Sequence, residues 1–271
     1  SQMKVINFQN GFDIIHLHSQ RYAFVVAKLS KKPCVLSFHN KITLPEFKQT
    51  EKAGMHTVSL SRSQRGELRT EAMIWNGVPT KKISYSFERG SYLMTIGRLT
   101  DQKGTDTAIK IAKRTGKKLL IFGRKGDSII RQEYFNQKIK PFLSEKIVYL
   151  GEVSHQKIYD YLRSAEALLF TIRRPEVCPL AVIEALACGT PVIGTKVNPL
   201  PEMLKNKKIA YLSNNASALV SAVKNIDKFS RTECRKYAEK YFEPIIVSVY
   251  FQHVFSEYFN YRHNKKKYDN N

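Results

Sequence analysis

Residues 173–194 read RRPEVCPLAVIEALACGTPVIG, and this stretch is the most informative about the fold. An apolar run at 166–171 precedes it and is typical of a buried strand. Pro179 is a favoured first residue of a helix, and the apolar residues 180–186 predict that helix. Residues 191–194 indicate a further strand. This order of strand, loop, helix and strand predicts a parallel sheet covered by helices.

The same alternation extends along the chain in both directions. The turn-forming residues 76–91 interrupt it, which predicts an α/β fold with domains at 1–84 and 85–250 and a helical, basic tail at 251–271. Residues 1–11 resemble the end of a helix, so we expect structure upstream of them. Strands are expected at 12–17, 33–37, 56–60, 92–96, 118–122, 146–150, 166–171 and 191–194, and helices at 21–29, 46–53, 61–69, 105–115, 180–186, after Ser154 and over most of the chain beyond 194.

Two glutamates, Glu176 and Glu184, stand in the first stretch with seven residues between them. An unpaired carboxylate inside an apolar helix is costly, so Glu184 needs a partner. A salt bridge to a nearby arginine is the purely structural alternative. The loop with two arginines and the helix amino terminus favour an anion at the carboxyl end of the preceding strand. We therefore expect a phosphate group to bind there.

A second candidate site lies in residues 96–106, which read IGRLTDQKGTD and also connect a strand to a helix. Gly97 allows close backbone approach, while Arg98 and Lys103 supply two charges that suit a diphosphate. Two solvated surface cations are the alternative in so basic a chain. The position at a strand's carboxyl end favours phosphate binding.

The chain of 271 residues has a net charge of +22, which predicts an anionic partner. An acidic membrane and phosphate-bearing small molecules both fit, whereas nucleic acid is disfavoured because no RNP, helix-turn-helix or finger motif occurs. Four separated cysteines disfavour a zinc site and indicate buried thiols in a reducing compartment. With no leader and no membrane-length apolar run, we expect a cytoplasmic protein that its basic surface can hold at the inner face of a membrane.

These motifs together resemble the retaining glycosyltransferases of family 4, the glycosyl transferases group 1, whose GT-B fold has two Rossmann-like domains. The motif G-R-L-x-x-x-K-G is matched at 97–104, and E-x7-E is matched at Glu176 and Glu184. The resemblance covers about residues 12 to 245. Further matches are DIIHLH at 13–18, SFH at 37–39, NGV at 76–78 and YLGEV at 149–153.

The resemblance implies that the protein moves a sugar from a nucleotide-diphosphate sugar, with UDP or GDP as the nucleotide, to a saccharide, lipid or small-molecule acceptor. The anomeric configuration is retained, and neither a metal nor a cofactor is expected. By this resemblance Arg98 and Lys103, beside Gly97, neutralise the diphosphate of the donor. Glu184 binds the ribose hydroxyls, and Glu176 binds hydroxyls of the transferred sugar.

The remaining roles also follow from the resemblance. The backbone amides of Leu180 and Ala181 face the phosphates, and the loop from Gly151 to Val153 lines the base. His18 approaches the reacting sugar from the opposite domain, so Glu176, His18, Arg98 and Lys103 are the expected catalytic residues. A satisfied, half-buried imidazole is the alternative for His18, and equally for His16 and His39.

Two features depart from the family pattern. Cys178-Pro179 replaces the usual Phe-Gly, which removes one backbone N–H beside the phosphate site. The amino-terminal lobe has only about 80 residues before the hinge and is expected to be incomplete as a Rossmann-like domain. A non-catalytic nucleotide-sugar-binding module and a half-enzyme that depends on a partner are therefore the alternatives to a complete glycosyltransferase. An epimerase of the same fold is disfavoured by the E-x7-E match.

Overall fold

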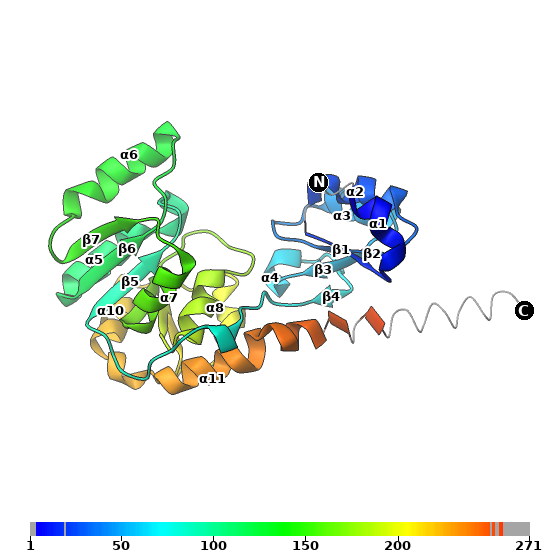
Figure 1. Cartoon of the computed structure of the whole chain (residues 1–271). Helices are drawn as coiled ribbons and strands as arrows, with labels where there is room; N and C mark the ends of the chain where they lie inside the picture. Colours follow the sequence, from blue (N-terminus) through cyan, green and yellow to red (C-terminus); the bar gives the residue numbers. More distant parts are fainter. Residues whose placement is uncertain (1–3, 19, 250, 253–254, 257–271) are drawn as a thin grey trace, which may run out of the picture. The chain divides into compact units, whose positions relative to one another are not determined.

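The computed structural model describes residues 4–18, 20–249, 251–252 and 255–256. The chain forms two compact units (Figure 1). The amino-terminal unit comprises residues 1–76 and 245–271, and the carboxyl-terminal unit comprises Gly77–Pro244.

The boundary between the units follows Asn76 and does not fall at residue 84, where the sequence placed it. The reason is that residues 78–83 are hydrogen-bonded to the carboxyl-terminal unit. The N–H of Val78 donates to the carbonyl of Phe242 at 2.8 Å. The guanidinium of Arg235, which is buried, donates to the carbonyl of Ile83 at 2.9 Å.

The end of the chain also differs from the predicted separate tail at 251–271. Helical residues from 244 onward lead back to the amino-terminal unit, where Val247, Phe251 and Phe255 pack against the sheet residues Val35 and Val58. Burial of apolar side chains thus makes this segment part of a core. Residues 257–271 lie outside the described residues.

The amino-terminal unit contains a four-stranded parallel sheet in the order β1-β2-β3-β4. Alternate strand residues such as Leu17 and Leu36 are buried with Phe38 in one core cluster. The two-residue strand β4 was not predicted, because so short a pairing with β3 shows no periodicity in sequence. The elements are α1 (Lys4–Phe8), β1 (Ile15–Leu17), α2 (Gln20–Leu29), β2 (Cys34–Ser37), α3 (Leu44–Lys52), β3 (His56–Ser59), α4 (Arg62–Arg65) and β4 (Ala72–Met73), with the 3-10 turn Gln9–Gly11 after α1.

The carboxyl-terminal unit contains a six-stranded parallel sheet in the order β10-β9-β8-β5-β6-β7. Helix α6 and strand β10 were not predicted, and β10 corrects the expectation of a mostly helical chain beyond residue 194. The elements are β5 (Tyr92–Ile96), α5 (Thr105–Thr115), β6 (Lys118–Phe122), α6 (Ile129–Lys138), β7 (Ile147–Gly151), α7 (His155–Arg163), β8 (Ala165–Phe170), α8 (Leu180–Ala187), β9 (Val192–Gly194), α9 (Leu200–Met203), β10 (Ala210–Leu212), α10 (Ala216–Lys224) and α11 (Arg231–Phe242), with 3-10 turns at Thr80–Lys82, Asp101–Lys103, Lys140–Phe142 and Ile226–Lys228.

The strand order in this unit is that of a doubly wound sheet, and its direction of winding reverses between β5 and β8. Leu93, Leu119 and Leu169 face one core cluster, which α5 and α10 complete on one side of the sheet. Helix α8 is apolar almost all round and is buried from Val182 to its end at Ala187. The loops after β5 and β8 therefore meet at the switch point, where such sheets bind ligands.

The four cysteines are buried thiols, as the sequence predicted. Within the part of the chain that the structure describes, no helix combines the length and apolar character that crossing a bilayer requires.

Candidate functional site

The loop after β5 begins with a close approach between two backbone segments. The N–H of Gly97 donates to the carbonyl of Phe122 at 3.1 Å. Gly97 has φ 153°, and Gly123 on the next strand has φ 134°. A Cβ on Gly123 would lie 1.9 Å from the Gly97 carbonyl oxygen, so a side chain there would force the two loops apart. These glycines hold the turn that presents Arg98.

The two predicted phosphate-binding cations have different surroundings. Arg98 is exposed and makes no hydrogen bond or ion pair with any other residue that the structure describes. The ammonium of Lys103, in contrast, lies 2.5 Å from Oε1 of Glu176, and both side chains are largely buried. The structure thus brings together Lys103 and Glu176 from motifs that are 73 positions apart.

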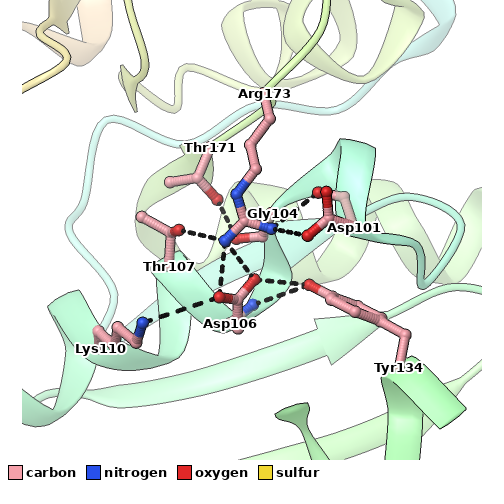
Figure 2. A network of polar contacts seen from close by, with 8 residues as sticks. All are labelled: Asp101, Gly104, Asp106, Thr107, Lys110, Tyr134, Thr171 and Arg173. Carbon is pink, nitrogen blue, oxygen red and sulfur yellow. Dashed lines mark hydrogen bonds and ion pairs between the residues drawn. The ribbon is translucent and has the colours of Figure 1, made fainter.

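Arg173 joins the same two loops, as Figure 2 shows. One terminal nitrogen donates to Oδ1 and the backbone carbonyl of Asp101, at 2.7 and 2.8 Å. The other donates to both carboxylate oxygens of Asp106, at 2.8 and 2.6 Å. In the sequence Arg173 and Arg174 are the two loop arginines that favour a bound anion, whereas in the fold the guanidinium of Arg173 is paired with two aspartates.

The charges of this network stabilise one another. Burial tends to raise the pKa of Asp106, but hydrogen bonds from Arg173 and Tyr134 outweigh it and leave the pKa below the ordinary value. The same hydrogen bonding to Asp106 raises the pKa of Arg173. Tyr134 donates its hydroxyl to Asp106 at 2.7 Å. The site therefore rests on an ionised carboxylate that is satisfied on several sides.

Glu184 lies in α8 with only 6% of its surface exposed. Burial raises the pKa of its carboxyl, while His155 and a hydrogen bond from Tyr159 partly oppose the rise. Nδ1 of His155 lies 3.6 Å from Oε1. The arginine salt bridge that was the structural alternative for Glu184 does not occur among the described residues.

An open pocket is lined by Glu184. The loop from Gly151 to Val153 lines it together with His155 and Ile96. Gly151 has φ 73°, a left-handed conformation that favours glycine at this turn. The structure thus brings the predicted base-lining loop and the predicted ribose ligand to one cavity. Neither His155 nor Tyr159 was singled out from the sequence, since nothing in the sequence pairs them with Glu184 before α7 packs beside α8.

Helix α8 begins at Leu180, and Ala181 follows in its first turn. Their N–H groups have no acceptor inside the helix and carry its positive dipole end. Pro179 precedes them as the N-cap residue with φ −70° and contributes no N–H. Cys178 is buried. The amides predicted to face phosphate therefore stand at the exposed start of an otherwise buried helix.

Three histidines gather in the amino-terminal unit at the carboxyl ends of β1 and β2. Nδ1 of His18 lies 2.9 Å from Nε2 of His39, and His16 hydrogen-bonds Ser37 at 2.8 Å. Burial, with a smaller effect of the neighbouring histidines, lowers the pKa of His16 to about 4. His16 and His39 thus have partners within their own unit. The predicted approach of His18 to a sugar bound in the other unit stays a prediction.

No group of three or more metal-ligating side chains is arranged to hold a metal ion among the residues that the structure describes. The metal-free chemistry expected from the sequence stays a prediction.

The model of the family described as glycosyl transferases group 1 matches residues 80–241, more than half of the chain. The chain belongs to this family. The matched region contains the turns at Gly97 and Gly151 and both glutamates of the site. It corresponds closely to the carboxyl-terminal unit.

This group 1 chain is similar to an uncharacterized glycosyltransferase of Methanocaldococcus jannaschii, with 27% identity over 72% of this chain and 59% of that protein. It is also similar to one of the proteins that form the phosphatidylinositol N-acetylglucosaminyltransferase of Arabidopsis thaliana, with 24% identity over 56% of this chain and 35% of that protein. The group 1 chain thus spans less than two thirds of the length of these two relatives.

Among solved structures, HepE of Anabaena in complex with UDP and glucose aligns with a TM-score of 0.78 at 16% identity, over 94% of this chain and 81% of that one. This likeness confirms the GT-B fold predicted from the sequence. The amino-terminal sheet of this group 1 chain has four strands among the described residues.

Proposed function

We propose that this protein is a retaining glycosyltransferase of family 4 that transfers a sugar from a nucleoside-diphosphate sugar to an acceptor hydroxyl. The observation that carries the proposal is the ion pair between Lys103 and Glu176. It joins the loops after β5 and β8 at the switch point of a doubly wound sheet, which is the ligand-binding position of this architecture. Membership of the group 1 family supports the same assignment.

In the proposed complex the diphosphate lies between the cations after β5 and the start of α8. Arg98 has its donors available for a bidentate contact with phosphate oxygens. Lys103 adds a point charge, and the amides of Leu180 and Ala181 add the positive end of a helix. The three kinds of donor suit a group with two phosphates.

The nucleoside and the sugar lie on either side of this diphosphate. The pocket in front of Glu184 receives the nucleoside, with the ribose hydroxyls donating to the carboxylate and the base beside the loop from Gly151 to Val153. Glu176 accepts hydrogen bonds from hydroxyls of the transferred sugar. Among the described residues the neighbours of the buried Glu184 carboxylate are His155 and Tyr159, with no lysine or arginine ion pair. Such a carboxylate suits neutral hydroxyl donors, which supports this role for Glu184.

The chemistry follows from where charge develops. When the bond between the anomeric carbon and the phosphate oxygen breaks, negative charge collects on the departing diphosphate. Arg98, Lys103 and the α8 amides are held in place before the reaction and stabilise that charge. The acceptor oxygen attacks the anomeric carbon from the same face, and its proton passes to the leaving phosphate. The configuration is thereby retained, and no metal is invoked in this step.

The acceptor is a saccharide, a lipid or a small molecule, and we assign its recognition to the amino-terminal unit, where His18 contacts the reacting sugar. The net charge of +22 supports a cytoplasmic protein that associates with the inner face of an acidic membrane.

Binding of nucleotides tests the proposal first. We would measure thermal shifts and calorimetric binding with UDP, GDP, ADP, CMP and their sugar conjugates, because a ligand of the native state raises the melting temperature by mass action. UDP-glucose is the first probe, since HepE was solved in complex with it. Glu184→Ala should abolish the shift for the nucleotide that binds the wild type.

Turnover is the second test. Arg98→Ala should lower product formation by at least about 100-fold, the loss typical of removing one electrostatic donor from a reacting centre. Arg114→Ala, which removes an exposed arginine that contacts Ser217, is the matched control and should leave turnover unchanged. Wild-type activity in the Arg98→Ala, Glu184→Ala double variant would overturn the assignment.

A non-catalytic nucleotide-sugar-binding module, or a half-enzyme that needs a partner, is the second candidate. Among the described residues the amino-terminal sheet has four strands, and the acceptor site of this fold is expected in that unit. Specific binding of a nucleotide sugar without turnover in the presence of diverse acceptors would select this alternative.

A further inference from the structure

The two loops of the proposed donor site are joined by a guanidinium that the proposed mechanism does not use. Arg173 lies three residues before Glu176, in the loop after β8. Its terminal nitrogens are both engaged inside the protein, one by Asp101 and the other by Asp106 and Thr107 (Figure 2). These contacts leave it poorly suited to bind a ligand itself.

The acceptors of Arg173 lie on both sides of Lys103 in sequence. Asp101 opens the 3-10 turn that ends at Lys103, and Asp106 lies in the first turn of α5. The backbone of the two loops is joined as well, since the N–H of Arg173 donates to the carbonyl of Gln102 at 2.8 Å. Because Asp101 and Asp106 are held by Arg173, the position of Lys103 between them is held as well.

A second contact joins the same two loops beside Lys103, and we call this close approach of Thr171 and Gly104 the joint. The hydroxyl of Thr171 donates to the carbonyl of Gly104 at 2.8 Å. Gly104 has φ 65°, and a Cβ there would lie 2.0 Å from the Thr171 carbonyl oxygen. The loops are therefore as close as a backbone without a side chain allows. Arg173, two residues after Thr171, adds its contacts with Asp101 and Asp106 to this close approach.

The carboxylate that receives Arg173 is itself anchored. Asp106 is 7% exposed. The hydroxyl of Tyr134 in α6 donates to its Oδ1 at 2.7 Å and accepts from its backbone N–H at 3.2 Å. Lys110 lies 3.9 Å away, one turn along α5. Asp106 is thus held in place by its neighbours, and Arg173 ties the loop after β8 to it.

We propose that Arg173 is a positioning residue that sets the spacing between the Lys103 ammonium and the Glu176 carboxylate, and with it the spacing between the diphosphate and sugar subsites. The inference rests on the proposed function. A displacement of about 1 Å between groups that stabilise one transition state can cost about 100-fold in rate. The role of Arg173 is therefore to hold two loops in register, with no direct contact to the donor.

The kinetic test compares Arg173→Ala, Arg173→Lys and Asp106→Asn with Arg89→Ala. Arg89 is a matched control because it also pairs with an aspartate, Asp227, has a similarly exposed side chain, and precedes β5 at the opposite end of the sheet from the site. We expect kcat to fall about 100-fold in Arg173→Ala, with less than a threefold change in KM for the donor. Arg89→Ala should stay within twofold of wild type in both.

The other variants separate positioning from simple stability. Lysine cannot bridge two aspartates, so Arg173→Lys should recover only a small part of kcat. Asp106→Asn should lower kcat in the same way, and Arg173→Ala combined with Asp106→Asn should be no slower than the worse single variant. A tenfold rise in donor KM in Arg173→Ala, absent from Asp106→Asn, would make Arg173 a phosphate ligand and overturn the proposal. Full kcat below the melting temperature of each variant would do the same.

A measurement that needs no activity distinguishes failure of this inference from failure of the proposed function. Amide hydrogen exchange of the ligand-free protein should become faster in residues 97–104 and 171–178 of Arg173→Ala, with residues elsewhere in the unit unchanged. Arg89→Ala should leave both segments as in wild type. Unchanged exchange in both segments of Arg173→Ala would overturn the positioning role even if no nucleotide sugar binds. Faster exchange of these segments in Arg173→Ala, together with a wild type that binds no nucleotide, would instead support the positioning role of Arg173 and reject the donor-site assignment.

Discussion

The pair formed by Lys103 and Glu176 leads to a counterintuitive prediction. Removing the negative charge with Glu176→Gln should tighten the binding of a nucleoside diphosphate while it lowers the rate of sugar transfer. In the ligand-free site the ammonium already has a carboxylate partner at 2.5 Å. Any phosphate that binds Lys103 has to compete with that carboxylate and also approach its charge.

The magnitude follows from the exposure of the two side chains, which is 21% for Lys103 and 24% for Glu176. Two unit charges about 4 Å apart interact by about 4 kcal/mol at an effective dielectric constant of about 20. Desolvation and solvent screening reduce the net value of such a partly exposed pair to about 1 to 2 kcal/mol. Glu176→Gln should therefore lower the Kd for UDP or GDP by about fivefold to thirtyfold.

The full donor should behave differently. In a UDP-sugar the gain at the phosphates is offset by the loss of carboxylate hydrogen bonds to the sugar hydroxyls, so its Kd should change by less than the Kd for UDP. Turnover should fall in proportion to the part of that contact made only in the transition state. The ratio of the two dissociation constants is thus the most direct readout of the subsite that Glu176 occupies.

Isothermal titration calorimetry of both ligands at two salt concentrations is the assay. Glu145→Gln is the matched control, because this substitution removes the same charge. Glu145 is exposed and precedes β7 at the far end of the sheet. Weaker or unchanged binding of the nucleoside diphosphate to Glu176→Gln, with the control unchanged, would refute the placement of phosphate at Lys103.

Three further predictions concern stability. Burial raises the pKa of Glu184, so the native state loses stability relative to Glu184→Gln as the pH rises from the unfolded-state pKa of about 4.5 through the raised pKa. The difference in melting temperature between the wild type and Glu184→Gln should therefore widen between about pH 4 and pH 8. A constant difference would contradict the burial argument. Gly104→Ala places a Cβ 2.0 Å from the Thr171 carbonyl at positive φ and should destabilise the protein by at least about 2 kcal/mol in urea unfolding, so an unchanged midpoint would show that the joint can yield. Arg231 is 5% exposed and donates to the carbonyls of Ala165 and Arg163 at 2.6 Å; Arg231→Ala should cost about 3 kcal/mol or more because it leaves buried carbonyls unsatisfied, and a loss below about 1 kcal/mol would mean that water replaces the guanidinium.

Much of the fold was readable because local patterns and global packing agree. The strand at 92–96 and the helix at 105–115 were predicted with the bounds that the structure has. A short apolar run marks the strand, while an apolar face and the terminating Gly116 mark the helix. Strand β10 and helix α6 were missed. Three strand residues at a sheet edge leave too few positions to show a period, and α6 has only two buried residues, Tyr134 and Phe135.

The sequence by itself determined the chemical groups of the candidate site and the loops that carry them. Arg98, Lys103, Glu176 and Glu184 stand in motifs whose spacing follows from one strand, one turn and one helix, and such short-range order is written in a local run of residues. The family assignment was accessible for the same reason, because it depends on ordered motifs and not on contacts.

Only the tertiary structure decided which of these groups act on one another. In the sequence Arg173 is one of two loop arginines, and only the pairing of β5 with β8 brings Asp101 and Asp106 to its guanidinium. Glu184 gained Tyr159 and His155 as neighbours because α7 packs beside α8. Lys103 and Glu176 lie about 70 positions apart in the sequence. Their side chains form a pair only because the order of the six parallel strands places their loops side by side. A contact between distant segments depends on the packing of everything between them, and no local pattern encodes that.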